Sequence, residues 1–370
     1  MRRRKSLLMC GLMAVLAISL FACGKQEEEE VQVEIESADP VESAEPVVVE
    51  ETGDASYLTG EIFEDQSYAN CRPVAVMIPN DNYGALPQYG ISYAGVIYEV
   101  PVEAPYTRLM AIFDQAVFDE ATTIGPVRSC RLYYCYFALE FDAIYAHYGQ
   151  SEYAKSFLSS GEIDNLSGLE GAVSNIMYWR DTSRSEPDNV FTSGETILEA
   201  IEYKEYETEH DEDYEAHYNF ADEEITPDAE DNAYKVAPGY DLSKPWFEYN
   251  EEDGLYYRYE YNSAQNDALT GEQLSFKNII IQSCSYSMMS SHNTYDINTT
   301  GSGDGWYITN GNAQKITWSK DSTDEPAKYY DESGEEIEIN TGKTWVSIVL
   351  NDDFDGVTLT SKADLEEDSE

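Results

Sequence analysis

The sequence predicts an α+β protein whose two halves differ in character. In residues 72–160, short β-branched and aromatic runs alternate with helical segments, which is typical of an α/β domain with a mixed sheet and flanking helices. Further along the chain, aromatic runs are separated by turn dipeptides, which is typical of antiparallel hairpins. We therefore expect an N-terminal α/β domain over residues 67–205 and a mostly antiparallel β domain over residues 206–352, which has an acidic lead-in.

The first 22 residues have the form of a secretory signal peptide. A basic start, MRRRK, precedes sixteen mostly apolar residues, and the run ends in the residues LFACG. A short apolar stretch with a small residue before the cut is typical of a removed segment rather than a spanning helix. In bacterial lipoproteins the cysteine after the cut carries the lipid. We expect Cys23 to be that residue, at the outer face of the cell membrane; an uncleaved membrane anchor is the alternative.

The acidic composition restricts the partners of the protein. The formal net charge is -50, which repels nucleic acid and anionic lipid headgroups. Residues 23–66 are rich in Glu, punctuated by Pro and free of aromatic residues before Tyr57, so we expect a disordered tether. Residues 353–370 form a second acidic segment, which we expect to be a frayed tail.

Strands and helices of the first half follow from hydrophobic runs and their boundaries. We expect strands at residues 72–78, 95–100, 107–113 and 142–149, and helices at residues 126–141, 151–160 and 192–203. Pro126 suits a first helical position, and Ser151 is a natural N-cap.

Two dipeptides and one apolar run define the second half. Asp253-Gly254 and Asn310-Gly311 each lie between aromatic runs, so we expect a hairpin at each. Residues 343–350 are expected to form a further strand.

Arginines cluster in the first half of this acidic chain. Seven arginines follow the leader, and five of them lie between positions 108 and 184. Arg128 and Arg131 are expected in the first turns of the helix near Pro126, where free backbone N–H groups favour an anion. Guanidinium groups bind carboxylate or phosphate with paired hydrogen bonds. We therefore expect an anion-binding site formed by Arg108, Arg128, Arg131, Arg180 and Arg184. The alternative is that these arginines form internal ion pairs with Glu103, Glu140, Asp142 and Asp181.

His147 is expected at the end of a buried strand, where ligands bind in open α/β sheets. We expect His147 and Ser151 to form hydrogen bonds with the ligand. In an enzyme, His147 would be the general base, oriented by Asp142 or Glu99, with Ser151 or Tyr148 nearby. No GxSxG, HExxH or SxxK motif is present, so binding is favoured over catalysis.

The sequence gives no support for a metal or cofactor. Near the C-terminus, NDDFDG resembles the start of a calcium loop, but Lys362 occupies the position that requires a bidentate Glu. Cys71, Cys130, Cys135 and Cys284 show no zinc spacing. Cys130 and Cys135 lie five residues apart on an expected helix, so they should face different sides and be small buried residues without a disulfide.

Several segments resemble the YerB-like lipoprotein family of Gram-positive bacteria, whose two parts are both domains of unknown function. The resemblance is carried by the segments RPVAVMIPN, GISYAGVIYEVPVEAPYTRLMAIF, IGPVRSCRLYY, FDAIYAHYGQS, WRDTSRSEPDNVFT, YYRYEYNSAQNDALTGEQLSFKNIII and KTWVSIVL. It implies a lipoprotein of two parts and no established activity. Asp188 stands where the family motif has a histidine, which removes a potential catalytic or metal-binding group, and Cys130 stands where small residues such as alanine are usual.

The hypothesis that best fits these features is an extracellular lipoprotein that binds an anion. Candidate ligands are a carboxylate of a cell-wall peptide, a phosphate-bearing wall polymer or a soluble metabolite. The alternatives are an envelope hydrolase or transferase that uses His147 and Asp142, and a purely structural or protein-interaction module. The sequence does not indicate a protein partner.

Overall fold

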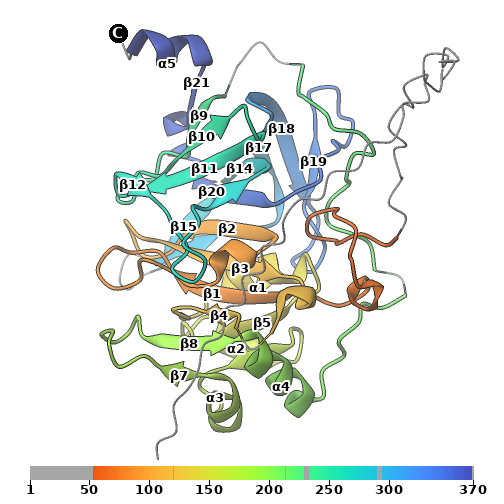
Figure 1. The fold of residues 1–370 in the computed structure, drawn as a ribbon, viewed down its shortest axis with the longest axis vertical. Helices are drawn as coiled ribbons and strands as arrows, with labels where there is room; N and C mark the ends of the chain where they lie inside the picture. The colour runs from red at the N-terminus through yellow and green to blue at the C-terminus, as the bar shows by residue number, and fades with distance from the viewer. Residues whose placement is uncertain (1–52, 120, 213, 229–232, 290–293, 369–370) are drawn as a thin grey trace, which may run out of the picture. The chain divides into compact units, whose positions relative to one another are not determined.

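The computed structural model describes residues 53–119, 121–212, 214–228, 233–289 and 294–368, all within one compact unit (Figure 1). The signal peptide, Cys23 and the tether as far as residue 52 lie outside the described residues. Among the described helices, none is both long and apolar enough to cross a membrane.

A ten-stranded mixed sheet contains strands from both halves of the chain. Its order is β19 (Lys328–Tyr330), β18 (Asn312–Lys320), β17 (Gly301–Thr309), β14 (Asn278–Cys284), β20 (Thr344–Leu350), β2 (Val96–Pro101), β3 (Thr107–Phe113), β1 (Val74–Pro79), β5 (Ile144–His147) and β6 (Asn165–Ser167). The two halves meet where β20 runs parallel to β2, with Val96 opposite Thr344. The α+β class is confirmed, including the mixed sheet of the first half, because β1 is antiparallel to β3 and parallel to β5.

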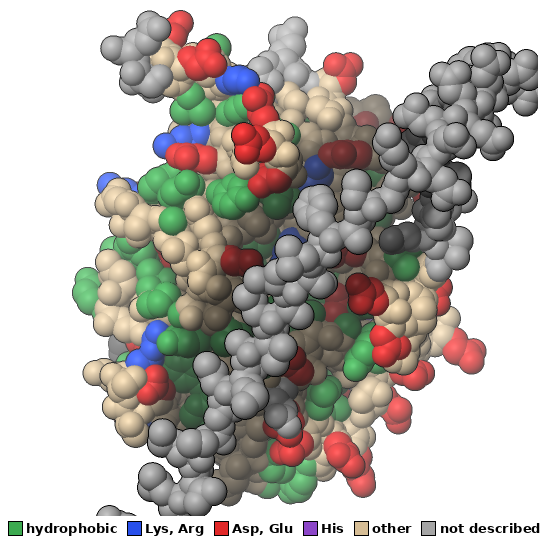
Figure 2. Space-filling model, viewed as in Figure 1, with side chains coloured by type: hydrophobic (Ala, Val, Ile, Leu, Met, Phe, Trp, Pro, Cys, Tyr) green, Lys and Arg blue, Asp and Glu red, His purple; other side chains and the backbone are tan. Residues whose placement is uncertain are grey.

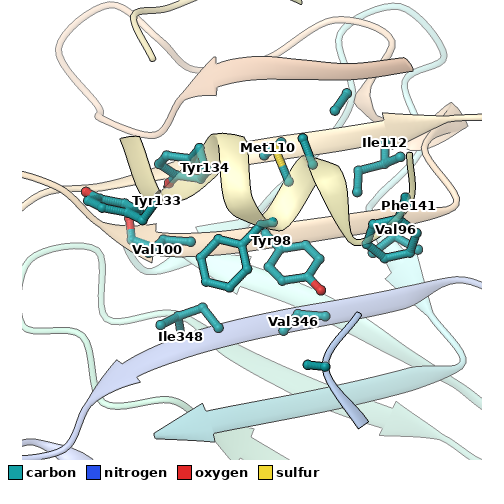
Figure 3. Close-up of a cluster of buried hydrophobic side chains, with 14 of the residues drawn as sticks. Val96, Tyr98, Val100, Met110, Ile112, Tyr133, Tyr134, Phe141, Val346 and Ile348 are labelled. Carbon is teal, nitrogen blue, oxygen red and sulfur yellow. Dashed lines mark hydrogen bonds between the residues drawn. The ribbon is translucent and has the colours of Figure 1, made fainter. Parts of the chain in front are cut away.

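The central strands are buried on both faces because both faces of the sheet are covered. Every residue of β1, β2, β3, β14 and β20 is buried. Figure 3 shows one face, where Tyr98, Met110 and Val346 project toward helix α1 (Leu132–Leu139). Alternate residues point to the opposite face, as the strand repeat requires. The sheet is therefore the middle layer of the molecule.

A second sheet covers the other face beside β20. It contains β12 (Ser263–Ala264), β11 (Leu255–Glu260), β10 (Trp246–Asn250), β9 (Lys235–Ala237) and β21 (Thr358–Thr360), with β13 (Ser275–Phe276) paired to β11. Phe247 and Phe276 pack edge-on against Trp345 of β20, with ring centroids 5.7 and 5.1 Å away. Two smaller sheets pair β4 (Thr123–Ile124) with β8 (Val190–Ser193) and β7 (Trp179–Arg180), and β15 (Tyr286–Met289) with β16 (Thr294–Ile297).

Both expected hairpins are present. Asn310 and Gly311 have φ values of 51° and 74°, and they join β17 to β18 in a two-residue turn closed by Thr309 opposite Asn312. Asp253-Gly254 ends the turn between β10 and β11. The left-handed backbone of the Asn-Gly turn matches the twist of the paired strands.

The helix expected over residues 126–141 is shorter than predicted, because its first six residues are extended. The backbone N–H of Val127 donates to Val190 O, and that of Arg128 donates to Met77 O, at 2.7 and 2.8 Å. These bonds tie the segment between β8 and β1, so α1 begins only at Leu132, with Arg131 as its extended N-cap. Arg128 and Arg131 therefore do not lie in the first turns of a helix.

The other helices agree with the prediction to different degrees. The predicted helix at residues 151–160 is reduced to α2 (Lys155–Leu158), and Ser151 Oγ accepts from Ala154 N–H in the turn before it. The helix predicted at residues 192–203 is α4 (Gly194–Lys204), with Ser193 as its N-cap. Helices α3 (Gly171–Met177) and α5 (Lys362–Asp368) were not predicted.

Both acidic ends are more ordered than the sequence suggests. Leu58 is buried in the core, and Ser56 Oγ donates to Asp114 at 2.7 Å, so the prediction of disorder as far as residue 66 is wrong from residue 53 onward. At the other end, β21 pairs with β9 and α5 follows it, in place of a frayed tail. Charge density alone gave no sign of these few anchoring contacts.

Candidate functional site

A cavity of about 320 Å³ opens where β1 ends and β3 begins. Its lining includes Asn80, Glu103, Thr107, Arg108, Arg128 and Asp188. The register that pairs Pro79 with Arg108 brings the β1 end and the β3 start together, and the extended segment after Pro126 supplies Arg128. On the face that Figure 2 shows, acidic side chains are spread widely and basic ones are few, so paired guanidinium groups in one cavity are a local exception.

Arg108 is a buried guanidinium that is only partly neutralised. The residue is 8% exposed, and its Nη1 donates to Ser129 O at 2.6 Å. Its nearest carboxylate oxygen, Glu103 Oε2, lies 3.7 Å from Nη2, too far for a hydrogen bond. Burial, together with the positive charges of Arg131 and Arg128, lowers the pKa of Arg108 to about 10, although the nearby Glu103 acts in the opposite direction. An anion at this position would relieve that unfavourable charge.

Arg128 and Arg131 each have a carboxylate partner. Arg128 Nε lies 3.0 Å from Asp188 Oδ1, and burial raises the pKa of the Asp188 carboxyl despite this ion pair. Arg131 Nε donates to Glu103 Oε1 at 2.8 Å, and its Nη2 contacts the same oxygen. Of the four partners that the ion-pair alternative named, only Glu103 pairs with the cluster.

A buried polar network lies directly behind the cavity. Asn80 Nδ2 and Thr107 Oγ1 both donate to Glu99 Oε1, at 3.1 and 2.8 Å. The other oxygen of Glu99 accepts from Arg258 Nη2 at 2.9 Å, and both side chains are fully buried. The Arg258 guanidinium carbon lies 4.0 Å from the ring centre of Trp345. The network therefore fixes two polar side chains of the cavity wall.

Arg258 was not among the residues predicted for the site, although its sequence context contains a signal. In β11 the buried residues are Tyr256, Arg258 and Glu260, which alternate with half-buried ones. A charged residue at a core-facing position of an alternating strand needs a buried partner. That partner, Glu99, is far away in the sequence, so the pair is visible only in the fold.

Arg180 and Arg184 do not line the cavity, contrary to the prediction. Arg184 donates to the carbonyl oxygens of Gly84, Ala85 and Pro87 at 3.0, 3.2 and 2.8 Å. Arg180 Nη1 donates to Asn189 Oδ1 at 2.6 Å. The loop between β7 and β8 nevertheless contributes to the site, because Pro187 and Asp188 are among the lining residues.

His147 is a buried structural side chain, not a group facing the cavity. Its Nδ1 lies 2.8 Å from Gly149 O and its Nε2 lies 3.3 Å from Asn165 Oδ1, while its ring stacks on Tyr145. Burial lowers the pKa of the imidazole. Ser151 is likewise absent from the lining residues. Neither residue lies where it was predicted to contact a ligand.

The predicted catalytic pair is not assembled either. Asp142 precedes β5 and pairs with Arg72 and His210, at 3.1 and 3.0 Å, whereas His147 ends the same strand. Each residue is satisfied by partners at its own end of β5, so Asp142 does not orient His147. The hydrolase or transferase hypothesis loses the residues on which it depended.

No disulfide joins the four cysteines of the described residues in this structure, but one pair is in contact. Cys130 Sγ lies 3.5 Å from Cys135 Sγ, and both residues are buried. The prediction that they face different sides is wrong, because Cys130 precedes the helix rather than lying on it. Among the described residues, no group of three or more His, Cys, Asp or Glu side chains could hold a metal.

The fold defines a class of protein in which two sequence regions contribute strands to one sheet, and a polar cavity lies where β1 ends and β3 begins. Residues 58–207 match the family described as "Protein of unknown function (DUF3048) N-terminal domain", and residues 235–346 match the corresponding C-terminal domain. The chain belongs to this YerB-like family, whose two parts are domains of unknown function.

A curated relative and a solved structure agree with this assignment. The chain is 30% identical over 295 residues to "Putative lipoprotein YerB" of Bacillus subtilis, covering 79% of this chain and 85% of the relative. The crystal structure of YerB protein from Bacillus subtilis is similar, with a TM-score of 0.71 and 28% identity, covering 83% of this chain and 99% of that chain. The relative is named as a lipoprotein, which agrees with the lipidation motif at Cys23.

Proposed function

We propose that this protein is anchored by a lipid at the outer face of the cell membrane and that it binds an anionic group between Arg108 and Arg128. The anchor is supported by the leader that ends at Cys23 and by the relative named as a lipoprotein. The lipid on Cys23 is the membrane contact of the protein. The binding site is the cavity at the end of β1.

The observation that carries the binding proposal is the state of Arg108. Its guanidinium is buried beside two other guanidinium groups, and the nearest carboxylate oxygen is 3.7 Å away. A buried cation is stabilised by a hydrogen-bonded anion, and the planar fork of arginine suits a carboxylate or phosphate. The cavity leaves room for such a group beside Arg108 and Arg128.

A neighbouring cavity indicates the class of ligand. A second cavity of about 400 Å³ shares Tyr106 and Thr107 with the first, and its lining includes Tyr295 and Asp352 but no basic residue. A ligand that extends past Tyr106 would therefore present a neutral or cationic part there. A carboxylate-bearing peptide or glycopeptide of the cell wall fits this pattern better than a polyphosphate, which is anionic along its whole length.

Thermal unfolding of the full chain in detergent, with matched ligands, tests this proposal. Short wall-type peptides with a free C-terminal carboxylate are compared with the same peptides as carboxamides, and with inorganic phosphate. At a hundred times its dissociation constant, a ligand adds about 2.7 kcal/mol to stability. We expect stabilisation by the carboxylate and not by the carboxamide. Equal effects of the two would contradict an anion site.

A further inference from the structure

We propose that Cys130 and Cys135 form an intramolecular disulfide bond in the mature protein. The inference uses only the location given under the proposed function, outside the cytoplasm, where disulfides persist. It does not depend on what the cavity binds.

The backbone around Arg131 brings the two thiols together. Arg131 is extended, with φ of −118° and ψ of 151°, and the helix begins at the next residue. The chain therefore turns at Arg131, and the Cys130 side chain lies against Cys135 in the first turn of α1. The sulfur atoms are 3.5 Å apart, and a disulfide of about 2.05 Å needs them to approach by only about 1.5 Å.

The position of Cys130 is fixed on both sides. Its backbone N–H donates to Gly149 O at 3.0 Å, and its carbonyl accepts from Ser151 N–H at the same distance. Cys135 is held in the helix, and both side chains are fully buried. Neither of the other described cysteines competes for these partners, because Cys71 contacts Ser67 O and Cys284 contacts the side chain of Gln282.

The bond forms by exchange with a disulfide of a small molecule or of an extracytoplasmic oxidising protein. One thiolate attacks the oxidising disulfide and the second thiol displaces the mixed disulfide, so two S–H bonds break, one S–S bond forms, and the two electrons and two protons convert the oxidising disulfide to two thiols. Burial raises the pKa of the Cys135 thiol, so Cys135 is a poor nucleophile in the folded protein. Oxidation is therefore expected during folding, before the core closes over the pair.

A disulfide here would fix one wall of the cavity. It would tie the segment that carries Arg128 to α1, and the Ser129 carbonyl between them accepts from the Arg108 guanidinium. The covalent bond would preserve this backbone when the ligand competes with Glu103 for the guanidinium groups.

Peptide mapping of the protein from its own compartment tests the inference. The full chain is produced with its leader in a bacterium that exports and lipidates proteins, then trapped by acid and alkylated in denaturant. Trypsin cleaves after Arg128, Arg131 and Lys155, so the bond would join the peptide of residues 129–131 to that of residues 132–155. A parallel sample is reduced, unfolded and refolded with glutathione disulfide.

We expect the linked peptide pair in both samples and its loss after dithiothreitol or in Cys135→Ala. Cys284→Ala, which also removes a buried thiol, should retain the link. Alkylation of both Cys130 and Cys135 in the exported protein would overturn the inference. If refolding alone gave the link, the geometry would stand but the oxidising location would be wrong, a result that leaves the ligand titrations unaffected. No link after refolding would show that the geometry itself is wrong.

Discussion

Arg128 Nε lies 3.0 Å from Asp188 Oδ1 at the wall of the cavity, so one of the two guanidinium groups proposed to bind an anion already has an anionic partner. Asp188 is 6% exposed, and burial raises the pKa of its carboxyl. An incoming anion must therefore compete with Asp188 for Arg128. In the proposed site, this competition would make Asp188 a residue that lowers the affinity for the anion.

Replacing Asp188 by Asn should strengthen anion binding. The amide keeps the size of the side chain but removes the charge that competes with the ligand, so we expect the dissociation constant to fall about tenfold, the equivalent of about 1.4 kcal/mol. In the wild type, affinity should rise as pH falls through the raised pKa of Asp188, because protonation frees Arg128. Calorimetric titration at several pH values measures both effects. A steep pH dependence that persists in Asp188→Asn would contradict this role.

Replacing Glu99 by Gln should destabilise the fold strongly. The amide can retain contacts to Asn80 and Thr107, but the buried Arg258 loses its closest carboxylate and keeps the more distant Glu260, whose Oε2 lies 3.5 Å from Nη2. Removing one partner of a buried ion pair costs about 3–5 kcal/mol. Chemical denaturation gives the free energy of unfolding.

The matched control is Glu224→Gln, which breaks the more exposed pair with Lys277. An exposed pair contributes about 0–1 kcal/mol. Similar losses for Glu99→Gln and Glu224→Gln would show that the Arg258 network does not support the fold.

Glu260 should make the protein less stable as pH rises from about 4.5 to about 7. Burial raises the pKa of its carboxyl from 4.5 to about 7, so over this range the folded state binds more protons than the unfolded state. The free energy of unfolding should therefore fall with pH by about 3 kcal/mol from this group and level off above the folded pKa. Half-buried Asp114, whose pKa burial raises to about 6, contributes a slope of the same sign. Unfolding curves of Glu260→Gln should show a shallower decline than the wild type; an unchanged slope would count against a buried proton on Glu260.

His147→Ala should lower stability and leave ligand affinity unchanged. The substitution removes a fully buried ring, its contact with Gly149 O and its stacking on Tyr145, at a cost of about 2–4 kcal/mol. Because His147 does not line the cavity, titration of the folded fraction should give the wild-type dissociation constant. Loss of binding by a variant that remains folded would show that His147 does contribute to the ligand site.

The elements best predicted from the sequence are those that local patterns determine. The runs that became β1, β2, β3 and β20 are rich in β-branched and other apolar residues, and Asn310-Gly311 favours the left-handed turn that joins β17 to β18. Such signals lie within a few neighbouring residues.

The predictions that the structure contradicts concern segments whose local structure depends on residues far away in the sequence. Pro126 suggested a helix start, but backbone bonds to Met77 and Val190 hold the following residues extended. That difference moved Arg128 out of a helix terminus and brought Cys130 against Cys135. In the same way, two of the five clustered arginines line the cavity, whereas Arg184 holds a loop through three carbonyl groups. Sequence spacing identified the cluster but not the division of roles within it.

The most direct test of the anion site is a calorimetric titration of the wild type, Arg128→Gln and Arg180→Gln with the same carboxylate peptide. Arg128 lines the cavity and Arg180 does not, so the two variants remove equal charge from different places. We expect Arg180→Gln to bind like the wild type and Arg128→Gln to lose at least about tenfold in affinity, the equivalent of about 1.4 kcal/mol. Equal affinities for the wild type and a folded Arg128→Gln would contradict the proposal that this cavity binds an anion.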